Sequence, residues 1–392
     1  MEEDEINPHI IIDNGSGYFK AGFSGDEGPK LVFPSCVGYP KYASDLNKDE
    51  FFVGEDAISK RGVLKLNYPI NHGIINNWND MEKIWHHALF NGLKVPPEDY
   101  NIMLTEPILN PKENRGKMAE IMFETYNVSG LYIENPTTLG LYSAGKFSGI
   151  VVDSGEGITQ IVPIFDGYSI SPGINRFNFA GKNLTKIMQI LLNENEYKFS
   201  TPSELEIVKS IKEKACYVAL DYEEEIKSIE PFDYELPDGT HCITKDERIR
   251  CTEALFKPSI FSNDDDELSI KWKGTSYKES NILEKDKGLG YACFDSIQKC
   301  DIDVRKDLYN CIILSGGNSM FNGLAERLTK EIKILAPESM KEEVKVIASP
   351  ERKFAAWIGG SILSTISTFK TMWITKEEYE ESGVAIVHKK TH

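Results

Sequence analysis

The feature that most constrains this chain is a short pattern that occurs twice: an apolar run, an aspartate and a glycine-rich turn. The first copy is IIIDNGSG at residues 10–17, and the second is GIVVDSGEG at residues 149–157. The apolar runs predict buried strands, and the turns predict backbone N–H groups that can approach a phosphate. An aspartate at a strand end suits a hydrated divalent cation. One copy is a common turn, but two copies predict facing hairpins that clamp a metal-bound nucleoside triphosphate.

Bulk properties exclude several classes of protein. The chain has 392 residues, enough for two domains, and a net charge of −17, which argues against direct nucleic-acid binding. No apolar run reaches the roughly 18–20 residues of a membrane span, so we expect no membrane insertion. The acidic start, Glu2 to Glu5, does not resemble a signal peptide. The seven scattered cysteines predict reduced thiols in the cytosol or nucleus.

Periodicity predicts an α/β protein whose strands and helices alternate in two halves with mixed sheets. The repeated hairpin indicates a duplication, with a cleft between the halves. We expect buried strands at 101–104 and 312–314, hairpins over 151–170, and helices at 80–90, 115–126, 204–217 and after 357–360. Two polar stretches interrupt the pattern: a surface loop at 39–50 and an insertion at about 262–287.

These residues resemble a known family. The two Asp–Gly tips and the LSGG of residues 314–317 are similar to the phosphate hairpins and adenosine loop of the actin, hexokinase and heat-shock-chaperone ATPases. Longer stretches are similar to actins and actin-related proteins, above all conventional actin and centractin, from about residue 8 to 392. They are KAGF (20–23), NDMEKIWHH (79–87), MFET (122–125), IKEK with CYVALD (211–221), and ERKF with WIGGSIL (351–363).

The resemblance implies an actin-like ATPase fold of two duplicated lobes around a central nucleotide cleft. Four subdomains are expected: 1–31, 69–142 and 355–392; 32–68; 143–180 and 288–354; and 181–287, which contains the insertion. The ligand would be ATP or ADP with Mg²⁺ or Ca²⁺. Asp13 and Asp153 would hold the cation through water.

The same resemblance assigns the nucleotide contacts. The expected binding residues are Gly15, Ser16, Gly17 and Lys20 from the first hairpin, Asp153, Gly155, Glu156 and Gly157 from the second, and Lys212, Glu213, Gly316, Gly317, Met320, Phe321 and Lys353 around the adenosine. Plain alternatives remain open. Lys20 could be a surface lysine, Met320 and Phe321 could be core residues, and Lys212 with Glu213 could be a solvated pair on a helix.

The sequence departs from actins where the attacking water is positioned. Pro136 replaces the family's glutamine, and Gln160 replaces its histidine. A proline side chain has no hydrogen-bonding group, and a glutamine can orient water but cannot act as an acid or base. We therefore expect nucleotide binding with slow or lost hydrolysis, with Gln160 as the candidate catalytic residue. Alternatively, Asn135 or Glu134 takes over the missing role.

Surface departures bear on assembly. The loop at 39–49 is short, and the polar insertion lies where actins carry an apolar plug, so we expect weak filament formation. The alternative is that the insertion loops outward and leaves the contacts intact. A groove for amphipathic helices between subdomains 1 and 3 is expected from Tyr142, Phe147, Tyr168, Leu363, Ile366 and Met372; core packing between the lobes is the alternative.

The resulting prediction is an actin-like, ATP-binding cytoskeletal protein in which the nucleotide acts as a conformational ligand. Its partners would be actin, actin-related or other cytoskeletal proteins, and it would act as a fixed subunit of a larger actin-related assembly. We expect it in the cytoplasm, with a nuclear pool. The main rival is a conventional filament-forming actin whose ATP hydrolysis is coupled to polymerisation.

Overall fold

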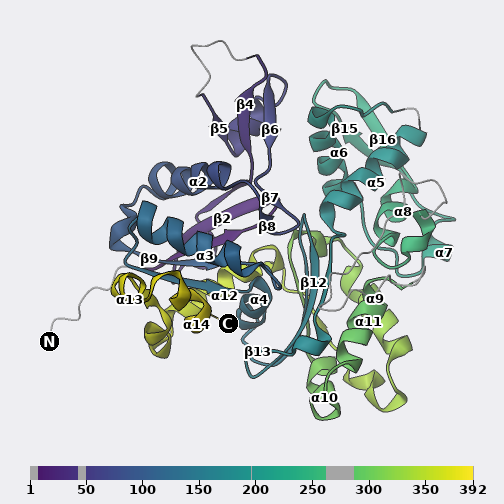
Figure 1. The fold of residues 1–392 in the computed structure, drawn as a ribbon. Helices are drawn as coiled ribbons and strands as arrows, with labels where there is room; N and C mark the ends of the chain where they lie inside the picture. The colour runs from purple at the N-terminus through teal and green to yellow at the C-terminus, as the bar shows by residue number, and fades with distance from the viewer. Residues whose placement is uncertain (1–7, 43–49, 196, 262–286, 392) are drawn as a thin grey trace. The chain divides into compact units, whose positions relative to one another are not determined.

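The structure, a computed structural model, describes residues 8–42, 50–195, 197–261 and 287–391 (Figure 1). The chain divides into two compact units, each with its own sheet and core. The first unit comprises residues 1–146 and 354–392, and the second comprises residues 147–353.

The first unit is built on a six-stranded mixed sheet in the order β19-β10-β9-β1-β2-β3. Its strands are β1 (Ile10–Asn14), β2 (Tyr18–Phe23), β3 (Leu31–Pro34), β9 (Asn101–Thr105), β10 (Gly130–Glu134) and β19 (Ile374–Thr375). Strands β1, β9 and β10 are parallel, and β2 returns antiparallel beside β1. The three isoleucines at 10–12 have no exposed surface, as their apolar run predicts.

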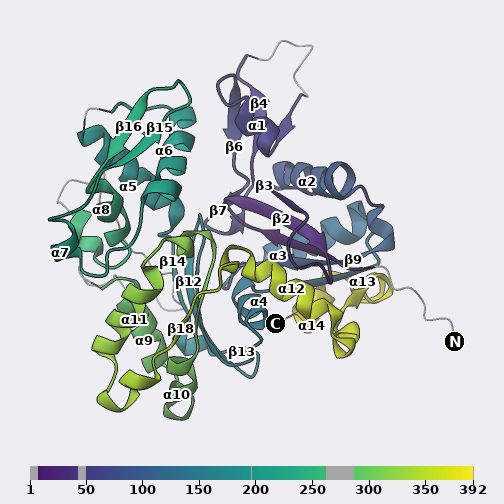
Figure 2. The same ribbon diagram turned by 180° about the vertical axis from the view of Figure 1, so that it is seen from behind.

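Helices cover both faces of this sheet (Figure 1, Figure 2). On one face, Ile10 and Ile12 pack with residues of α2 (Trp78–His86) and α3 (Lys112–Glu120). On the other face, Ile11 packs with residues of α4 (Pro136–Ser143) and α12 (Ala355–Thr365). Helices α4 and α12 cross closely at Gly359, where a Cβ would lie 1.8 Å from the carbonyl oxygen of Leu139.

The second unit repeats this strand order. Its sheet runs β13-β12-β11-β17-β18, and β14 pairs with β12. The strands are β11 (Gly149–Ser154), β12 (Thr159–Phe165), β13 (Tyr168–Ser169), β14 (Asn175–Phe177), β17 (Ile312–Ser315) and β18 (Val346–Ile347). Strands β11, β17 and β18 are parallel, and β12 forms a hairpin with β11. The shared plan confirms the prediction of a duplicated α/β fold with mixed sheets.

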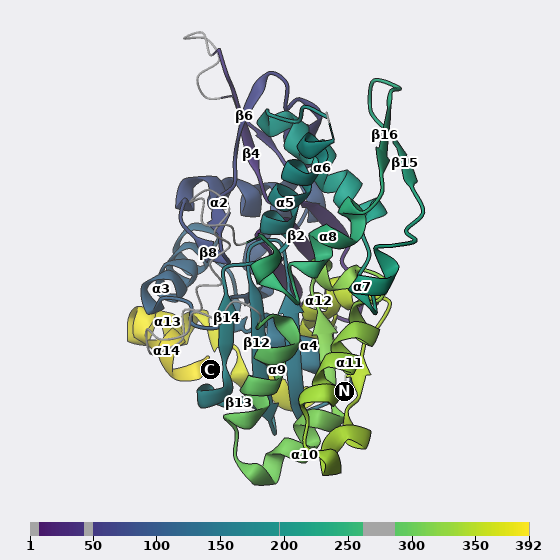
Figure 3. The same cartoon turned by 90° about the vertical axis from the view of Figure 1, so that its right-hand side faces the viewer.

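The core of the second unit joins this sheet to several helices, which are α5 (Gly181–Glu194), α6 (Pro202–Ala215), α8 (Glu247–Glu253), α9 (Leu289–Gln298), α10 (Ile302–Asn310) and α11 (Leu324–Leu335). The hairpin of β15 (Phe232–Glu235) and β16 (His241–Thr244) lies beside α6 (Figure 3). The Tyr234 hydroxyl attaches it there by donating to Ser210 Oγ at 2.8 Å.

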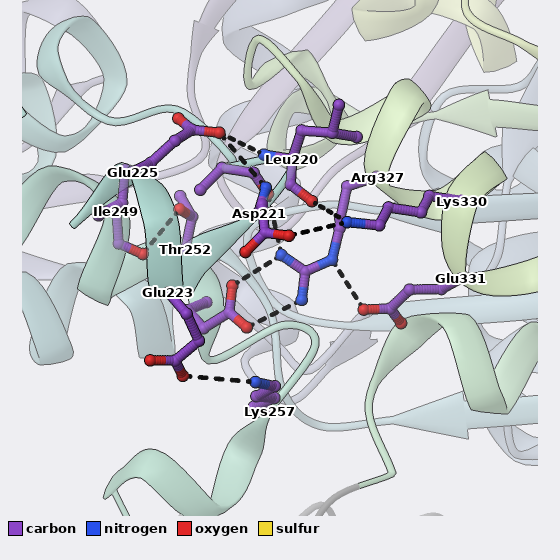
Figure 4. Close-up of polar contacts among 12 residues, drawn as sticks. Leu220, Asp221, Glu223, Glu225, Ile249, Thr252, Lys257, Arg327, Lys330 and Glu331 are labelled. Carbon is purple, nitrogen blue, oxygen red and sulfur yellow. Dashed lines mark hydrogen bonds and ion pairs between the residues drawn. The ribbon is translucent and has the colours of Figure 1, made fainter. Parts of the chain in front are cut away.

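A buried ion-pair network ties α8 to α11 (Figure 4). Arg327 donates to both carboxylate oxygens of Glu253, at 2.9 and 3.1 Å, and to Glu331 at 2.8 Å. It also donates to the carbonyl of Ala219, just before α7 (Tyr222–Glu225). Because a bidentate pair satisfies both charges away from water, the network can lie in the core.

The chain segments before and after the insertion touch each other in the second unit. The backbone N–H of Leu289 donates to the carbonyl of Leu255 at 2.7 Å. A Cβ at Gly288 would lie 2.2 Å from the carbonyl oxygen of Phe256, so the backbones are in contact there. The predicted polar insertion itself falls almost wholly outside the described residues, as does the acidic start at Glu2 to Glu5.

The remaining elements of the first unit are small. They are α1 (Glu55–Ser59), β4 (Val37–Pro40), β5 (Phe52–Val53), β6 (Leu64–Asn67), β7 (Ile70–Asn71), β8 (Ile74–Ile75), α13 (Lys376–Ser382) and α14 (Val387–Lys390). Helices α2 and α3 each continue into a π-helical turn, His87–Leu93 and Ile121–Thr125.

Two boundaries predicted from sequence are wrong. Tyr39 and Pro40 belong to β4 and not to a polar loop, and residues 43–49 lie outside the described part of the chain. Tyr39 holds this place because its hydroxyl donates to the buried Asp80 of α2, while Lys83 Nζ lies 2.6 Å from the same hydroxyl. The last apolar helix was expected after residues 357–360, but α12 begins at Ala355. Its first turn already packs in the core through Ala356 and Trp357.

Two bulk predictions concern the described residues. Every cysteine is buried and free of a disulfide, as its scattered position predicts. Within residues 8–42, 50–195, 197–261 and 287–391, no helix combines the length and apolar character needed to cross a bilayer.

Candidate functional site

Asp13 lies at the end of β1 in the first unit and is almost fully buried, with 6% of its surface exposed. In the sheet register it stands directly opposite Lys20 of β2. Lys20 Nζ donates to one carboxylate oxygen of Asp13 at 2.5 Å, and Thr105 Oγ1 donates to the other at 2.9 Å. The carboxylate is therefore held by a cation and a hydroxyl on one face of the sheet.

The turn after Asp13 contains Gly15, Ser16 and Gly17. Ser35 anchors it, since its N–H donates to the Gly17 carbonyl at 3.0 Å and its hydroxyl donates to the Gly15 carbonyl at 2.6 Å. Ser16 Oγ accepts from the backbone N–H of Gly73 at 3.0 Å. Because Ser16 acts there as an acceptor, its own hydrogen is left to donate elsewhere.

The same sheet edge continues through Thr105 to Glu134, which stand opposite each other at the ends of β9 and β10. Glu134 is 6% exposed and accepts from the Asn135 N–H at 2.7 Å and the Tyr132 hydroxyl at 3.2 Å. Burial raises the pKa of Glu134 to about 7, although these hydrogen bonds oppose the shift. Pro136 follows as the first residue of α4, a position that favours proline.

Asp153 is the counterpart of Asp13 in the second unit. It stands directly opposite Gln160 of β12, as Asp13 stands opposite Lys20. Gln160 is 1% exposed, and its Nε2 donates to Asp153 Oδ2 at 3.2 Å. The second hairpin thus replaces a cation with a neutral amide at the same place in the register.

The turn after Asp153 caps a helix. The carbonyls of Gly155 and Glu156 accept from the N–H groups of Gly181 and Lys182, at 3.0 and 2.9 Å, at the start of α5. A Cβ at Gly181 would lie 2.7 Å from Glu156 Oε2, so the carboxylate lies against the first residue of the helix. The positive end of the helix dipole favours a carboxylate there. Gly157 is buried within the turn.

The loop after β17 packs directly on this hairpin. Gly316 has φ of 88°, and a Cβ there would lie 2.3 Å from the Ser154 carbonyl oxygen and 2.8 Å from Asp153 Oδ1. Only glycine combines this φ with such a close approach. A Cβ at Gly317, in contrast, would meet open space. Asn318 then donates from Nδ2 to Ser154 Oγ at 2.9 Å.

The predicted base-side residues also lie in the second unit, and they differ in burial. Lys212 is 2% exposed, and its Nζ donates to the Gly181 carbonyl at 2.8 Å and to Thr185 Oγ1 at 3.0 Å. Its neighbour Glu213 is exposed. Phe321 belongs to the core cluster, Met320 is 36% exposed, and Lys353 is half-buried.

These two half-sites have the chemistry that a phosphate and a hydrated cation need. Glycine turns offer N–H groups, Lys20 and Ser16 can donate to phosphate oxygens, and the two aspartates can accept from metal-bound water. Among the described residues no group of three or more His, Cys, Asp or Glu is gathered as a direct metal cage. The predicted meeting of the two hairpins in one cleft stays a prediction.

The family model described as Actin matches residues 4–392, which is essentially the whole chain. This chain belongs to the actin family. The resemblance inferred from the motifs, and the actin-like fold, are therefore confirmed.

The expected groove residues of this actin-family protein are distributed over both units. In the first unit, Tyr142, Leu363 and Met372 pack against the core cluster on the α4 and α12 face, while Ile366 is 39% exposed. In the second unit, Phe147 and Tyr168 are 63% and 66% exposed. The helix-binding groove stays a prediction.

Sequence reasoning missed three features of the actin-family site. The strand β10 was not recognised, so the alignment of Glu134 with Thr105 and Asp13 was not foreseen. The pairing of Lys20 with Asp13 follows from the hairpin register, which the sequence could have given. Asn318 was passed over, and its only signal was a polar residue directly after Gly316 and Gly317.

Proposed function

We propose that this actin-family protein binds ATP or ADP with a hydrated Mg²⁺ or Ca²⁺ and uses the nucleotide mainly as a conformational ligand. We further propose that its hydrolysis is slow or lost and that it acts as a subunit of a larger actin-related assembly. Cytoskeletal proteins would be its partners, in the cytoplasm with a nuclear pool.

One observation carries the binding proposal: the two aspartates occupy the same place in two repeated sheets. Each is the last but one residue in the first strand of a parallel trio and faces a donor across a hairpin, Lys20 for Asp13 and Gln160 for Asp153. Ligands of open α/β sheets bind at the carboxyl ends of the parallel strands. The glycine turns that follow both aspartates lie at those ends.

The proposal of slow hydrolysis rests on the side chains at the two positions where the sequence differs from actins, Pro136 and Gln160. Pro136 starts α4 and offers no side-chain donor or acceptor. Gln160 is buried and donates to Asp153, so its amide is engaged in holding a carboxylate. Neither residue can accept a proton from an attacking water, and general-base catalysis typically contributes a factor of about 10²–10⁴.

Calorimetry tests binding. Nucleotide-free full-length protein should release or absorb heat on titration with Mg-ATP, and the variant Asp13→Asn should weaken the cation dependence of binding. The exposed Asp303→Asn substitution on α10 is the matched control. A well-folded wild type that gives no heat with Mg-ATP would contradict the proposal.

Single-turnover phosphate release tests hydrolysis. The wild type should release phosphate more slowly than a conventional actin measured alongside it. The double variant Pro136→Gln with Gln160→His should be faster than the wild type. Release by the wild type at the pace of filamentous actin would refute slow hydrolysis.

The second candidate is a conventional filament-forming actin, and the family match over residues 4–392 is what favours it. The two candidates differ in self-assembly. Pelleting over a series of polymerisation buffers should give little sedimented protein if the chain is a fixed subunit, and native co-purification should then recover a stoichiometric complex. Long filaments at low micromolar protein would favour the second candidate.

A further inference from the structure

A buried carboxylate that the proposed binding contacts do not include lies at the end of β10. It belongs to Glu134, which is 6% exposed. The Glu106 N–H donates to the Glu134 carbonyl at 3.0 Å, so a second glutamate lies beside it. The titratable and charged groups around the carboxyl come from several elements: Tyr132 of the same strand with Tyr142 of α4 near it, Glu106 after β9, Arg115 of α3 and, beyond Thr105, the Asp13–Lys20 pair.

Arg115 divides its hydrogen bonds between Glu106 and the end of the chain. Its Nε and Nη2 both donate to Glu106 Oε1, with an Nε–Oε1 distance of 2.6 Å. Its Nη1 donates to the carbonyl and hydroxyl oxygens of Thr391, at 3.2 Å each. Thr391 is 4% exposed and directly follows α14, which lies against α3 (Figure 1). The arginine therefore fastens the last described residue of the chain to the Glu106 carboxylate.

The charge of this cluster changes near neutral pH. Burial raises the pKa of Glu134 to about 7, with Glu106 adding to the shift and Arg115 opposing it. An ionised Glu134 adds a second buried carboxylate to the one that Arg115 already pairs with, and a buried charge is costly unless it is compensated. A guanidinium binds a carboxylate more strongly than a neutral oxygen, because both partners are charged. The bonds from Arg115 to the neutral oxygens of Thr391 are therefore its weaker set.

We infer that Arg115 and Glu134 form a proton-dependent clasp on the C-terminal segment, which holds Thr391 while Glu134 is protonated and releases it when Glu134 ionises. The ionised carboxylate draws donors of Arg115 toward itself, and the bonds to Thr391 are the ones that break. The protonated carboxyl makes no such demand, so Nη1 stays on Thr391. Because coupling between two sites is reciprocal, release of Thr391 favours ionisation of Glu134 to the same extent. The clasp does not depend on nucleotide binding.

Carboxypeptidase trimming of the full-length protein, followed by mass spectrometry, tests the clasp, since proteolysis tracks the population of the open form. The wild-type rate is divided by the rate for Glu134→Gln at the same pH, which cancels the pH dependence of the protease. Glutamine mimics the protonated acid, so the variant should stay closed. The ratio should be about one at pH 5.5 and at least about fivefold at pH 8.5, the lower end of typical coupling between sites.

Glu113→Gln, at an exposed position in the first turn of α3, is the matched control and should be trimmed like the wild type at each pH. The reciprocal effect gives a second measurement. Deleting residues 391–392 frees Arg115, so the midpoint of the pH-dependent melting difference between the wild type and Glu134→Gln should fall by about 0.7 pH unit, the same fivefold factor. A trimming ratio that stays near one at pH 8.5 would overturn the inference, as would a midpoint that the deletion leaves in place.

Discussion

The equivalent edges of the two sheets use the same scaffold for different electrostatics. In the first unit, the edge carries Lys20, Asp13, Thr105 and Glu134 in adjacent register positions. In the second unit, the matching positions are Gln160, Asp153 and Ser315, so that Asp153 is the single formal charge among them.

The difference shows that duplicated architecture does not require duplicated chemistry. At the first edge the buried charge of Asp13 is compensated by the charge of Lys20. At the second edge Asp153 accepts a hydrogen bond from the neutral amide of Gln160. Removing one partner from a buried charge pair is costly because it leaves an uncompensated charge. The first edge should therefore be the more sensitive of the two to substitution, pH and salt.

The largest expected effect is that of Lys20→Met. The variant leaves Asp13 buried with only a hydroxyl donor, and the free energy of unfolding should fall by about 3–5 kcal/mol. Urea unfolding followed by circular dichroism measures this loss. The double variant Asp13→Asn with Lys20→Met removes both charges and should recover most of the stability. A loss below about 1 kcal/mol would show that the pair is well solvated and would remove the contrast between the edges.

Glu134→Gln should stabilise the protein in a pH-dependent way. The pKa of Glu134 is about 7 in the folded protein against 4.5 for its ordinary value, so the folded state binds this proton more tightly. The resulting stabilisation is complete below pH 4.5 and is lost as the pH rises through 7. Glutamine mimics the protonated acid, and the variant should gain up to roughly 3 kcal/mol above pH 8.

Melting temperatures of the variant and the wild type, measured from pH 5 to pH 8, check this sign. Their difference should grow with pH. Glu253→Gln is the control, since Glu253 pairs with Arg327 in the second unit, and its loss should destabilise the protein at pH 8. A difference between Glu134→Gln and the wild type that stays constant with pH would contradict the assigned titration.

Gln160→Leu should have a smaller effect than Lys20→Met. It removes one hydrogen bond to a carboxylate, and the free energy of unfolding should fall by about 1–2 kcal/mol. Gln160→Glu places a like charge directly across the strand from Asp153 and should cost more than leucine. If leucine costs as much as Lys20→Met in the same urea experiment, the second edge is as dependent on its cross-strand partner as the first.

Ser16→Ala and Ser154→Ala should have the smallest effects, and the two effects should differ in kind. Ser16 can donate its hydrogen to a ligand, so Ser16→Ala should weaken ATP binding about fivefold, which is about 1 kcal/mol. It should change stability little, because the Gly73 N–H that loses its acceptor is partly exposed and can bond to water. Ser154 donates inward to Thr159, so Ser154→Ala should lower stability by about 1 kcal/mol. Calorimetric titration and thermal melting on both variants would show this crossed pattern; a similar loss of both properties in each variant would refute it.

Local patterns in the sequence predicted the parts of the fold that depend on neighbouring residues. The runs at 10–12 and 150–152 are buried strands, and the apolar spacing in 80–90 correctly gave the buried face of α2. The short strand β10 was missed because Leu131, Tyr132 and Ile133 are buried on both faces, which leaves no alternation to recognise.

Contacts between distant residues could not be predicted in this way. The neighbours of Tyr39 in the sequence predict a polar loop, because its hydrogen-bond partner Asp80 lies 41 residues later. The raised pKa of Glu134 depends on its burial and on Glu106 across the sheet, neither of which its own neighbours in the sequence indicate. The hydrogen bond of Asn318 likewise joins it to Ser154, 164 residues away.

The backbone contact between Leu255 and Leu289 has a practical consequence for engineering. Because the backbone already closes the loop at this contact, a longer polypeptide between the two segments adds little loop-closure entropy. A fluorescent protein or an affinity tag joined after Phe261 would keep the core residue Phe256 and would use neither terminus.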